Sequence, residues 1–306
     1  MTRWSGVFGA PVTPFTPDGD VDHDALRRCV RFLCAHGVDG ITLPLHTGES
    51  PSLTAPERMS LVETAIDAVG GEVPVLVHAS APGTPEAVSL ARHAEASGAA
   101  AVVVVTPYHW RPGPESLRAH YRTVADSVGI DVMAYNFPSR LGVDVTPELI
   151  ETLIDACPNF VGVKDASYDM QSFTECVRRS TARRSDFSML TGVEYLLPSM
   201  VVGGSGCFSP SSAIAPRLVR RLEQACRAGD LGRARPLQHR MSALWHLLRA
   251  TGYPASVKAA MALLDRPVGG VRLPLLDLDT AATARLREGL VTLGIFDEEP
   301  RGWESP

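Results

Sequence analysis

The sequence predicts a (β/α)8 barrel, the TIM barrel fold, with extra helices after the barrel. Short runs rich in valine, isoleucine and small residues alternate regularly with helical patterns along the 306-residue chain. The runs are apolar at nearly every position, which is typical of parallel strands buried on both faces. A doubly wound open sheet is the rival, but no GxGxxG follows the first run. The even spacing of the units therefore favours the barrel.

Eight such runs are expected to be strands. They cover residues 6–12, 40–44, 73–78, 100–106, 130–136, 160–165, 187–191 and 204–209. Between them, apolar residues recur three and four positions apart, as at Leu26, Val30 and Leu33, which predicts amphipathic helices.

Helix start and stop signals support these segments. Thr54 and Glu57 form a capping-box pattern, and Thr84 and Thr146 each precede a proline, as an N-cap residue often does. Glycines stand where three of the helices are expected to stop, at Gly37, Gly70 and Gly98.

The chain continues beyond the eight units with three further helical patterns, at 236–250, 254–265 and 280–293. A barrel does not need them, so we expect them to pack on its outside. The predicted organisation is a catalytic barrel over residues 1–230 and a C-terminal helical extension over residues 231–306.

Composition excludes several classes of protein. The net charge of −5 comes from mixed charges with no basic stripe, so neither nucleic acid nor a membrane is an expected partner. No signal peptide is expected at the N-terminus, and the six cysteines form no CxxC pair, which suits a reducing cytoplasm. The histidines form no metal-binding motif, so we expect no metal and no cofactor.

Reactive groups in such barrels lie at the C-terminal ends of the strands and in the loops that follow. Four of the eight predicted strands end in, or are soon followed by, polar side chains that could react or bind. These are His46–Ser50, then Thr106, Tyr108 and His109, then Tyr135, Asn136 and Arg140, and finally Lys164 and Asp165.

Lys164 is the most informative of these residues. Of the 29 basic side chains only two, Lys164 and Lys258, are lysines. A primary amine can form a Schiff base with a ketone, whereas a guanidinium cannot. The amine must be neutral, so burial has to lower its pKa from ~10.4. The ordinary alternative, a lysine paired with a carboxylate inside the barrel, is about equally common, but the scarcity of lysine favours the reactive one. Lys258, on a C-terminal helix, is expected to have a surface or packing role.

Schiff-base chemistry also needs proton transfer and a site for the rest of the substrate. Tyr135, one strand from Lys164, is placed for proton transfer, although a tyrosine often simply fills a barrel top. Thr47, with the loop amides of Gly48 and Glu49, suits a small carboxylate, unless the turn is a plain capping turn. Arg140 could bind a second carboxylate, although a lone loop arginine is more often solvated.

Together these residues resemble a known family. GVFGAPVTPF, HTGES, TPY, YNFPSR and GVKDAS are similar to the pyruvate-dependent class I aldolases, the family of dihydrodipicolinate synthase and N-acetylneuraminate lyase. The resemblance continues into YPASVKAAMALLD and GGVRLPL, so it spans the barrel and the C-terminal helices.

The resemblance implies roles for individual residues. Lys164 would form the Schiff base with pyruvate or a related 2-oxo acid, and Tyr135 would be the general acid and base. Thr47 and the amides of its turn would bind the carboxylate of the 2-oxo acid. The remaining residues expected at the substrate are His46, Gly48, Glu49, His109, Arg140 and Phe208. The family is usually tetrameric, so a homo-oligomer built as a dimer of dimers is expected.

Two departures from the synthase pattern concern its proton relay. His46 stands where the synthase has the first of two threonines. His109 stands where the synthase has a second tyrosine that reaches the neighbouring subunit. Arg140 matches the synthase's carboxylate-binding arginine, which the neuraminate lyase lacks. An imidazole titrates near neutral pH, so a changed relay could still transfer protons.

Four hypotheses follow. The first is a Schiff-base lyase on a 2-oxo acid, with or without an aldehyde, that has a modified relay and performs an aldol reaction or a dehydration. The second is an authentic 4-hydroxy-tetrahydrodipicolinate synthase, which condenses pyruvate with aspartate semialdehyde. The third is a non-catalytic barrel that binds 2-oxo acids. The fourth, a phosphosugar isomerase with a phosphate site at Gly203-Gly204, lacks a general-base glutamate at a strand end.

Overall fold

The computed structural model describes residues 3–303 of the chain. Its eight strands are hydrogen-bonded in sequence order into a closed barrel, which confirms the predicted fold. The strands are β1 (Gly6–Gly9), β2 (Gly40–Leu43), β3 (Val75–His78), β4 (Ala101–Val105), β5 (Asp131–Asn136), β6 (Phe160–Asp165), β7 (Ser188–Gly192) and β8 (Gly206–Ser209).

The predicted runs all contain a strand, and the differences are at the ends. β6 has the predicted bounds, whereas β1 ends at Gly9 although the apolar run continues to Val12. Pro11 has no N–H to donate to a neighbouring strand, so pairing cannot continue through it.

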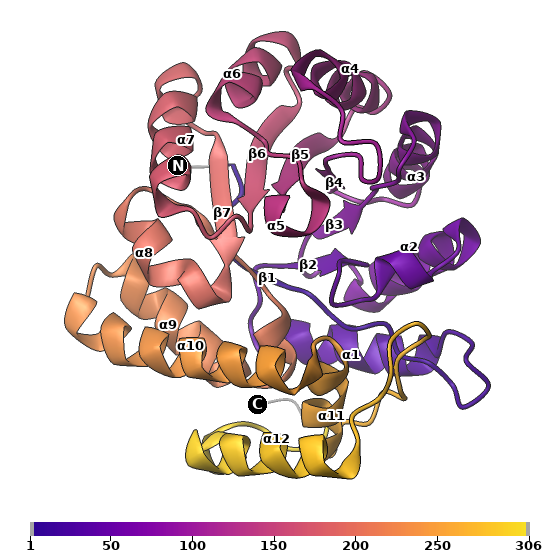
Figure 1. Cartoon of the computed structure of the whole chain (residues 1–306), viewed down its shortest axis with the longest axis vertical. Coiled ribbons are helices and arrows are strands. Elements are labelled where there is room, and N and C mark those ends of the chain that lie inside the picture. The colour runs from indigo at the N-terminus through magenta and orange to yellow at the C-terminus, as the bar shows by residue number, and fades with distance from the viewer. Residues whose placement is uncertain (1–2, 304–306) are drawn as a thin grey trace. The chain divides into compact units, whose positions relative to one another are not determined.

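The contacts of the chain define two compact units, and Leu76–Phe208 makes up most of the first. Here β4 to β7 pair in parallel, and every residue of these four strands is buried. In Figure 1 helices lie outside these strands, namely α3 (Thr84–Ala96), α4 (Pro114–Ala125), α6 (Pro147–Ala156) and α7 (Met170–Arg183). The unit also contains α5 (Pro138–Leu141) and α8 (Leu196–Val201).

The second unit combines Val7–Val75 with the chain from Ser209 onward. Its helices are α1 (His23–Ala35), α2 (Ala55–Val69), α9 (Pro216–Arg227), α10 (Leu231–Gly252), α11 (Ala255–Leu263), α12 (Thr280–Thr292) and α13 (Ile295–Glu298). The long helix α10 packs against α9, α11 and α12 (Figure 1). The three C-terminal helices that the sequence predicts are therefore present.

Two helix starts differ from the prediction. The N-cap of α3 is Gly83, and Thr84 is already helical; its hydroxyl instead hydrogen-bonds His120 Nδ1. Helix α10 begins at Leu231 and not at 236, because the Asp230 side chain accepts a hydrogen bond from the Arg233 amide and so caps an earlier turn. The capping box of Thr54 and the N-cap Thr146 are confirmed.

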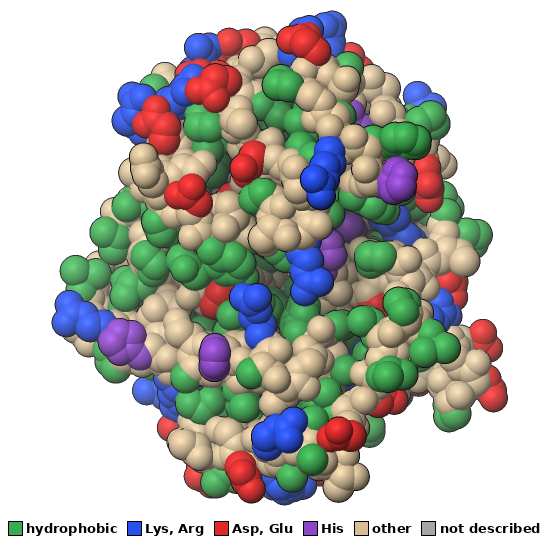
Figure 2. Space-filling view, viewed as in Figure 1, with side chains coloured by type: hydrophobic (Ala, Val, Ile, Leu, Met, Phe, Trp, Pro, Cys, Tyr) green, Lys and Arg blue, Asp and Glu red, His purple; other side chains and the backbone are tan. Residues whose placement is uncertain are grey.

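Charges of both signs are spread over the face of the molecule in Figure 2. Among the described residues, no helix has the length and apolar character needed to cross a membrane. The same residues contain no group of three or more acidic, histidine or cysteine side chains that could hold a metal ion. All six cysteines have free thiols.

Candidate active site

Lys164 and Tyr135 face each other across two neighbouring strands. In the parallel register of β5 and β6, Tyr135 is opposite Lys164 and Asn136 is opposite Asp165. All four residues are buried at the C-terminal ends of their strands, where barrels of this kind hold their reactive groups. The structure thus brings together the two residues that the sequence predicts to be catalytic.

The amine of Lys164 is buried and makes no ion pair within the described part of the chain. Its Nζ lies 4.0 Å from the centre of the Tyr135 ring and 5.8 Å from that of Phe137. Burial lowers the pKa of Lys164 to about 8, while the negative charges of Glu194 and Asp165 oppose the shift. At pH 7 about a tenth of such an amine is neutral, against roughly one part in 3,000 without the shift. The ordinary alternative, a paired lysine, does not apply.

The neighbouring carboxylate of Asp165 is occupied by other partners. One oxygen accepts a hydrogen bond from Asn136 Nδ2 at 2.8 Å, and the other accepts from the backbone and hydroxyl of Ser167. Asn136 in turn accepts a hydrogen bond from the Val145 amide. Asp165 therefore holds the loop after β6 and leaves the amine of Lys164 available.

Tyr135 keeps its proton. Burial, followed by the negative charges of Glu194 and Asp165, raises its pKa above the usual range, and Arg140 opposes this. Its ring stacks on Phe137 with centroids 5.7 Å apart and planes 7° apart. A fixed, protonated phenol can donate a hydrogen bond or a proton, which is the function that the sequence predicts for it.

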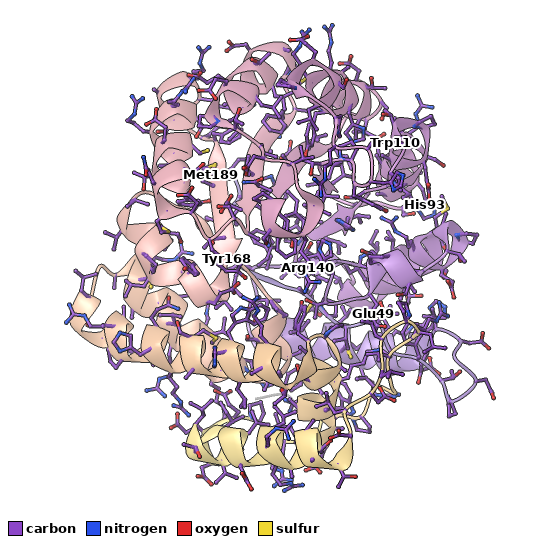
Figure 3. The ribbon with its side chains drawn as sticks, viewed as in Figure 1. Glu49, His93, Trp110, Arg140, Tyr168 and Met189 are labelled. Carbon is purple, nitrogen blue, oxygen red and sulfur yellow. The ribbon has the colours of Figure 1, made fainter. Side chains whose placement is uncertain are left out.

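Sequence reasoning missed Glu194, which follows β7. Its carboxylate accepts a hydrogen bond from the Tyr168 hydroxyl at 2.9 Å, and it lies so close to Gly192 that a Cβ there would come within 2.4 Å of it. Tyr168, labelled in Figure 3, has a left-handed φ of 62° in the loop after β6. The available signal was an acidic residue three positions after the predicted strand 187–191.

His78 at the end of β3 was also missed. Its Nε2 hydrogen-bonds Ser80 Oγ at 2.8 Å, and its ring centroid lies 6.3 Å from that of Tyr135. Ser80 also accepts a hydrogen bond from the Val105 amide, which fixes the hydroxyl. The signal was a histidine ending an apolar run.

The other predicted residues of this unit have different environments. Arg140 is exposed on α5 (Figure 3), and Phe208 is buried in β8. His109 is exposed, with a left-handed φ of 82°, and its ring makes an edge contact with that of Trp110. Arg140 influences Tyr135 through its charge.

The predicted carboxylate-binding turn, residues 46–49, belongs to the second unit and follows β2. Thr47, Gly48 and Glu49 are buried and His46 is half-buried. The Thr47 hydroxyl forms a hydrogen bond with the Tyr253 hydroxyl, and Thr13 Oγ1 donates to the Gly48 carbonyl at 2.6 Å.

The expectation of a surface or simple packing role for Lys258 needs correction. Its side chain is 3% exposed, and Nζ lies 2.7 Å from Glu49 Oε1, whose side chain is fully buried. The helical pattern of α11 alone could not reveal this pair, because Glu49 lies more than two hundred positions away in the chain.

The geometry around Lys164 is that of a nucleophilic amine. It combines a buried amine that has no counter-ion among the described residues, a lowered pKa and a neighbouring phenol that keeps its proton. These features favour attack on a ketone carbonyl and formation of an iminium, with proton transfer close at hand.

Comparison with known proteins agrees with this chemistry. The model of the dihydrodipicolinate synthetase family matches residues 3–292. A 4-hydroxy-tetrahydrodipicolinate synthase of Afipia carboxidovorans is 37% identical over 301 residues, covering 97% of this chain and 99% of the relative. The crystal structure of dihydrodipicolinate synthase from Aquifex aeolicus has a TM-score of 0.91 at 33% identity, over 95% of this chain and 99% of that one. YagE of E. coli K12 is a prophage protein of the same family that was solved in complex with pyruvate. Its structure has a TM-score of 0.91 at 31% identity, covering 96% of this chain and 100% of that one.

Proposed function

This chain belongs to the dihydrodipicolinate synthetase family and is a class I, Schiff-base-forming lyase, and from that premise we propose that it condenses pyruvate with aspartate semialdehyde. The product would be 4-hydroxy-tetrahydrodipicolinate. The sequence alone ranked this second to a lyase with another acceptor. The names of the relatives favour it.

The observation that carries the proposal is the Lys164 amine, which is buried, has no ion-pair partner among residues 3–303 and has a pKa of about 8. The neutral amine attacks C2 of pyruvate, and water leaves to give the iminium. The iminium draws electrons from the methyl carbon, which loses a proton and becomes the nucleophilic carbon of an enamine. That carbon attacks the aldehyde carbon, and the resulting alkoxide takes up a proton. The amino group of the adduct then attacks C2, closes the ring and releases Lys164.

Other residues are proposed to serve these steps. Tyr135 supplies and removes the protons, because its phenol stays protonated beside the amine. Thr47 and the amides of its turn bind the carboxylate of pyruvate, with His46 beside them. Arg140 binds the carboxylate of the semialdehyde, since a guanidinium pairs with a carboxylate through two hydrogen bonds.

Borohydride trapping tests the Schiff base. With pyruvate and borohydride, wild-type protein should gain the mass of a reduced pyruvate adduct on the peptide that contains Lys164. Lys164→Arg, which keeps the charge, should gain none. Absence of the adduct from wild-type protein would refute the proposal, and a coupled assay with aspartate semialdehyde then tests the acceptor.

A second candidate acceptor is favoured by one observation. His109 lies exposed in the loop after β4 and replaces a relay tyrosine of the synthase, as His46 replaces a threonine. These changes would suit a different aldehyde or a 2-oxo sugar acid. If the relay explains them, His46→Thr with His109→Tyr should raise activity with aspartate semialdehyde. If wild-type protein prefers another aldehyde at equal concentrations, the second candidate is the function.

The assembly also remains a proposal. We expect a homo-oligomer built as a dimer of dimers, and the large exposed side chain of Trp110 beside His109 is consistent with a subunit contact there. Light scattering of wild-type protein and of Trp110→Ala tests this: a tetramer that dissociates in the variant would support it, and a monomeric wild-type protein would contradict it.

A further inference from the structure

We propose that Lys258 and Tyr253 are positioning residues that hold the carboxylate-binding turn, residues 46–49, from the C-terminal part of the chain. The inference rests on the proposed function, because it assumes that the turn binds the carboxylate of the 2-oxo acid. It gives the second of the two lysines a defined role.

The first contact is a buried ion pair. Lys258 Nζ lies 2.7 Å from Glu49 Oε1, donates a hydrogen bond to the Gly270 carbonyl at 2.5 Å and lies 4.2 Å from the centre of the Phe15 ring. The other oxygen of Glu49 accepts a hydrogen bond from the Arg272 amide at 2.9 Å. Each charge is thus matched, as a buried charge must be to persist.

The turn needs such support. Glu49 has a left-handed φ of 53°, a backbone conformation that costs energy for a residue with a side chain and persists only when its surroundings impose it. The carboxylate of Glu49 is bound by Lys258 and by the Arg272 amide, which lie more than two hundred residues later in the chain. Figure 3 labels Glu49 in the turn before α2. The pair therefore fixes the backbone amides of the turn.

The second contact acts on the hydroxyl of Thr47. Tyr253 and Thr47 share a hydrogen bond, and the Tyr253 ring is held by an edge contact with Trp245, with centroids 5.2 Å apart. Either hydroxyl can donate in this bond; because a phenol is the more acidic of the two, we infer that Tyr253 donates and Thr47 accepts. The proton of Thr47 is then directed away from Tyr253 and is available to a carboxylate. Without Tyr253, the Thr47 hydroxyl could rotate.

The test measures the pyruvate concentration that gives half-maximal borohydride trapping on Lys164. Tyr253→Phe, which removes one oxygen, should raise this concentration roughly tenfold while the maximal trapped fraction is unchanged, because one hydrogen bond to a charged ligand is misdirected. Lys258→Met should raise it at least as much. The double variant Glu49→Gln with Lys258→Met removes both charges, so it tests the loss of the pair without leaving an unpaired buried carboxylate.

Two controls separate positioning from general stability. Tyr121→Phe removes a buried hydroxyl that donates to the Val104 carbonyl, and Arg266→Met removes a fully buried guanidinium that donates to the Ala213 and Pro300 carbonyls. Both should lower the melting temperature and leave the half-saturating pyruvate concentration unchanged. Hydroxyacetone, a ketone without a carboxylate, should be trapped equally by wild-type protein and the Tyr253 and Lys258 variants.

The outcomes are distinct. If wild-type protein is not trapped by pyruvate, the proposed function fails. If wild-type protein is trapped and folded Tyr253→Phe and the double variant keep its half-saturating concentration, the positioning role is refuted. If the variants lose hydroxyacetone trapping as well, their effect is general and the inference is equally overturned.

Discussion

Lys164 Nζ lies 4.0 Å from the centre of the Tyr135 ring, with the two residues opposite each other on β5 and β6. The ring covers the amine and contributes to its burial, while both carboxylates that influence it, Glu194 and Asp165, have other hydrogen-bond donors. An amine in this position is dehydrated, and no side chain of the described part of the chain neutralises it as a counter-ion. Its reactivity therefore depends on pH and on the charges of Glu194 and Asp165.

The reaction should speed up with pH around the pKa of Lys164. Burial lowers this pKa to about 8, so the neutral fraction of the free enzyme rises through that value and then levels off. We expect kcat/KM for pyruvate to rise about tenfold per pH unit below the inflection. The profile is measured by a coupled assay. A decrease at higher pH would report a second group and does not bear on this prediction, whereas a rising limb without an inflection between pH 7 and 9 would contradict it.

Glu194→Gln should move that inflection to lower pH. The negative charge of Glu194 favours the protonated amine, so its removal lowers the pKa of Lys164 further. Tyr168→Phe, which removes a hydrogen bond but keeps the charge, should shift the profile less. The exposed Glu115, changed to Gln, is the matched control and should leave the profile in place. An unchanged profile in Glu194→Gln would mean that its charge does not reach the amine.

Lys164→Met should stabilise the fold. The unfolded chain binds the lysine proton up to pH ~10.5, but the folded protein releases it near pH 8, so wild-type stability rises with pH between these values. Below pH 8 the buried charge lowers the free energy of unfolding by on the order of 3 kcal/mol, and a methionine carries no such charge. Urea unfolding should therefore show a gain in the free energy of unfolding near pH 7 that shrinks by about pH 10. A variant that is less stable than wild type at both values would contradict this.

Tyr135→Phe should separate binding from turnover. The ring that stacks on Phe137 and covers Lys164 is kept, and only the hydroxyl is lost. We expect kcat to fall by about 10² to 10⁴-fold, the usual effect of losing a general acid or base, while pyruvate can still be trapped on Lys164 over longer times. Tyr195→Phe, which removes another phenol of the same unit, serves as a control. A kcat within threefold of wild type would assign the proton transfers elsewhere.

Much of the barrel could be predicted from the sequence because its strands are short and apolar and are separated by clear helix start signals. The run 160–165 became β6 without any change of bounds. Errors arose where a local signal competed with another. The helix predicted to start at 236 begins at Leu231, five positions earlier, because Asp230 caps it, and Thr84 bonds His120 instead of capping. The bounds of β1 depend on a proline that removes a donor.

Only part of the site could be predicted from the sequence. Lys164 and Tyr135 could be found because a polar residue at the end of an apolar strand has few reasons to be there, and because lysine is rare in this chain. His78 carries the same kind of signal at the end of the run 73–78, whereas Glu194 stands in a loop, among other polar residues. The pairing of Lys258 with Glu49 has no local signal at all, since nothing in a helical pattern indicates which distant carboxylate a buried amine will meet.

The chain by itself determined the order of strands and helices, the side chains at the strand ends and the presence of one amine suited to covalent chemistry. These features depend on residue type and on the spacing between residues that are near neighbours in the chain. Only the tertiary structure decided that this amine is buried with no counter-ion among residues 3–303, and that Lys258 pairs with Glu49 of the turn 46–49. Burial and the choice of charge partners arise when segments remote in sequence pack together, and no local pattern encodes them.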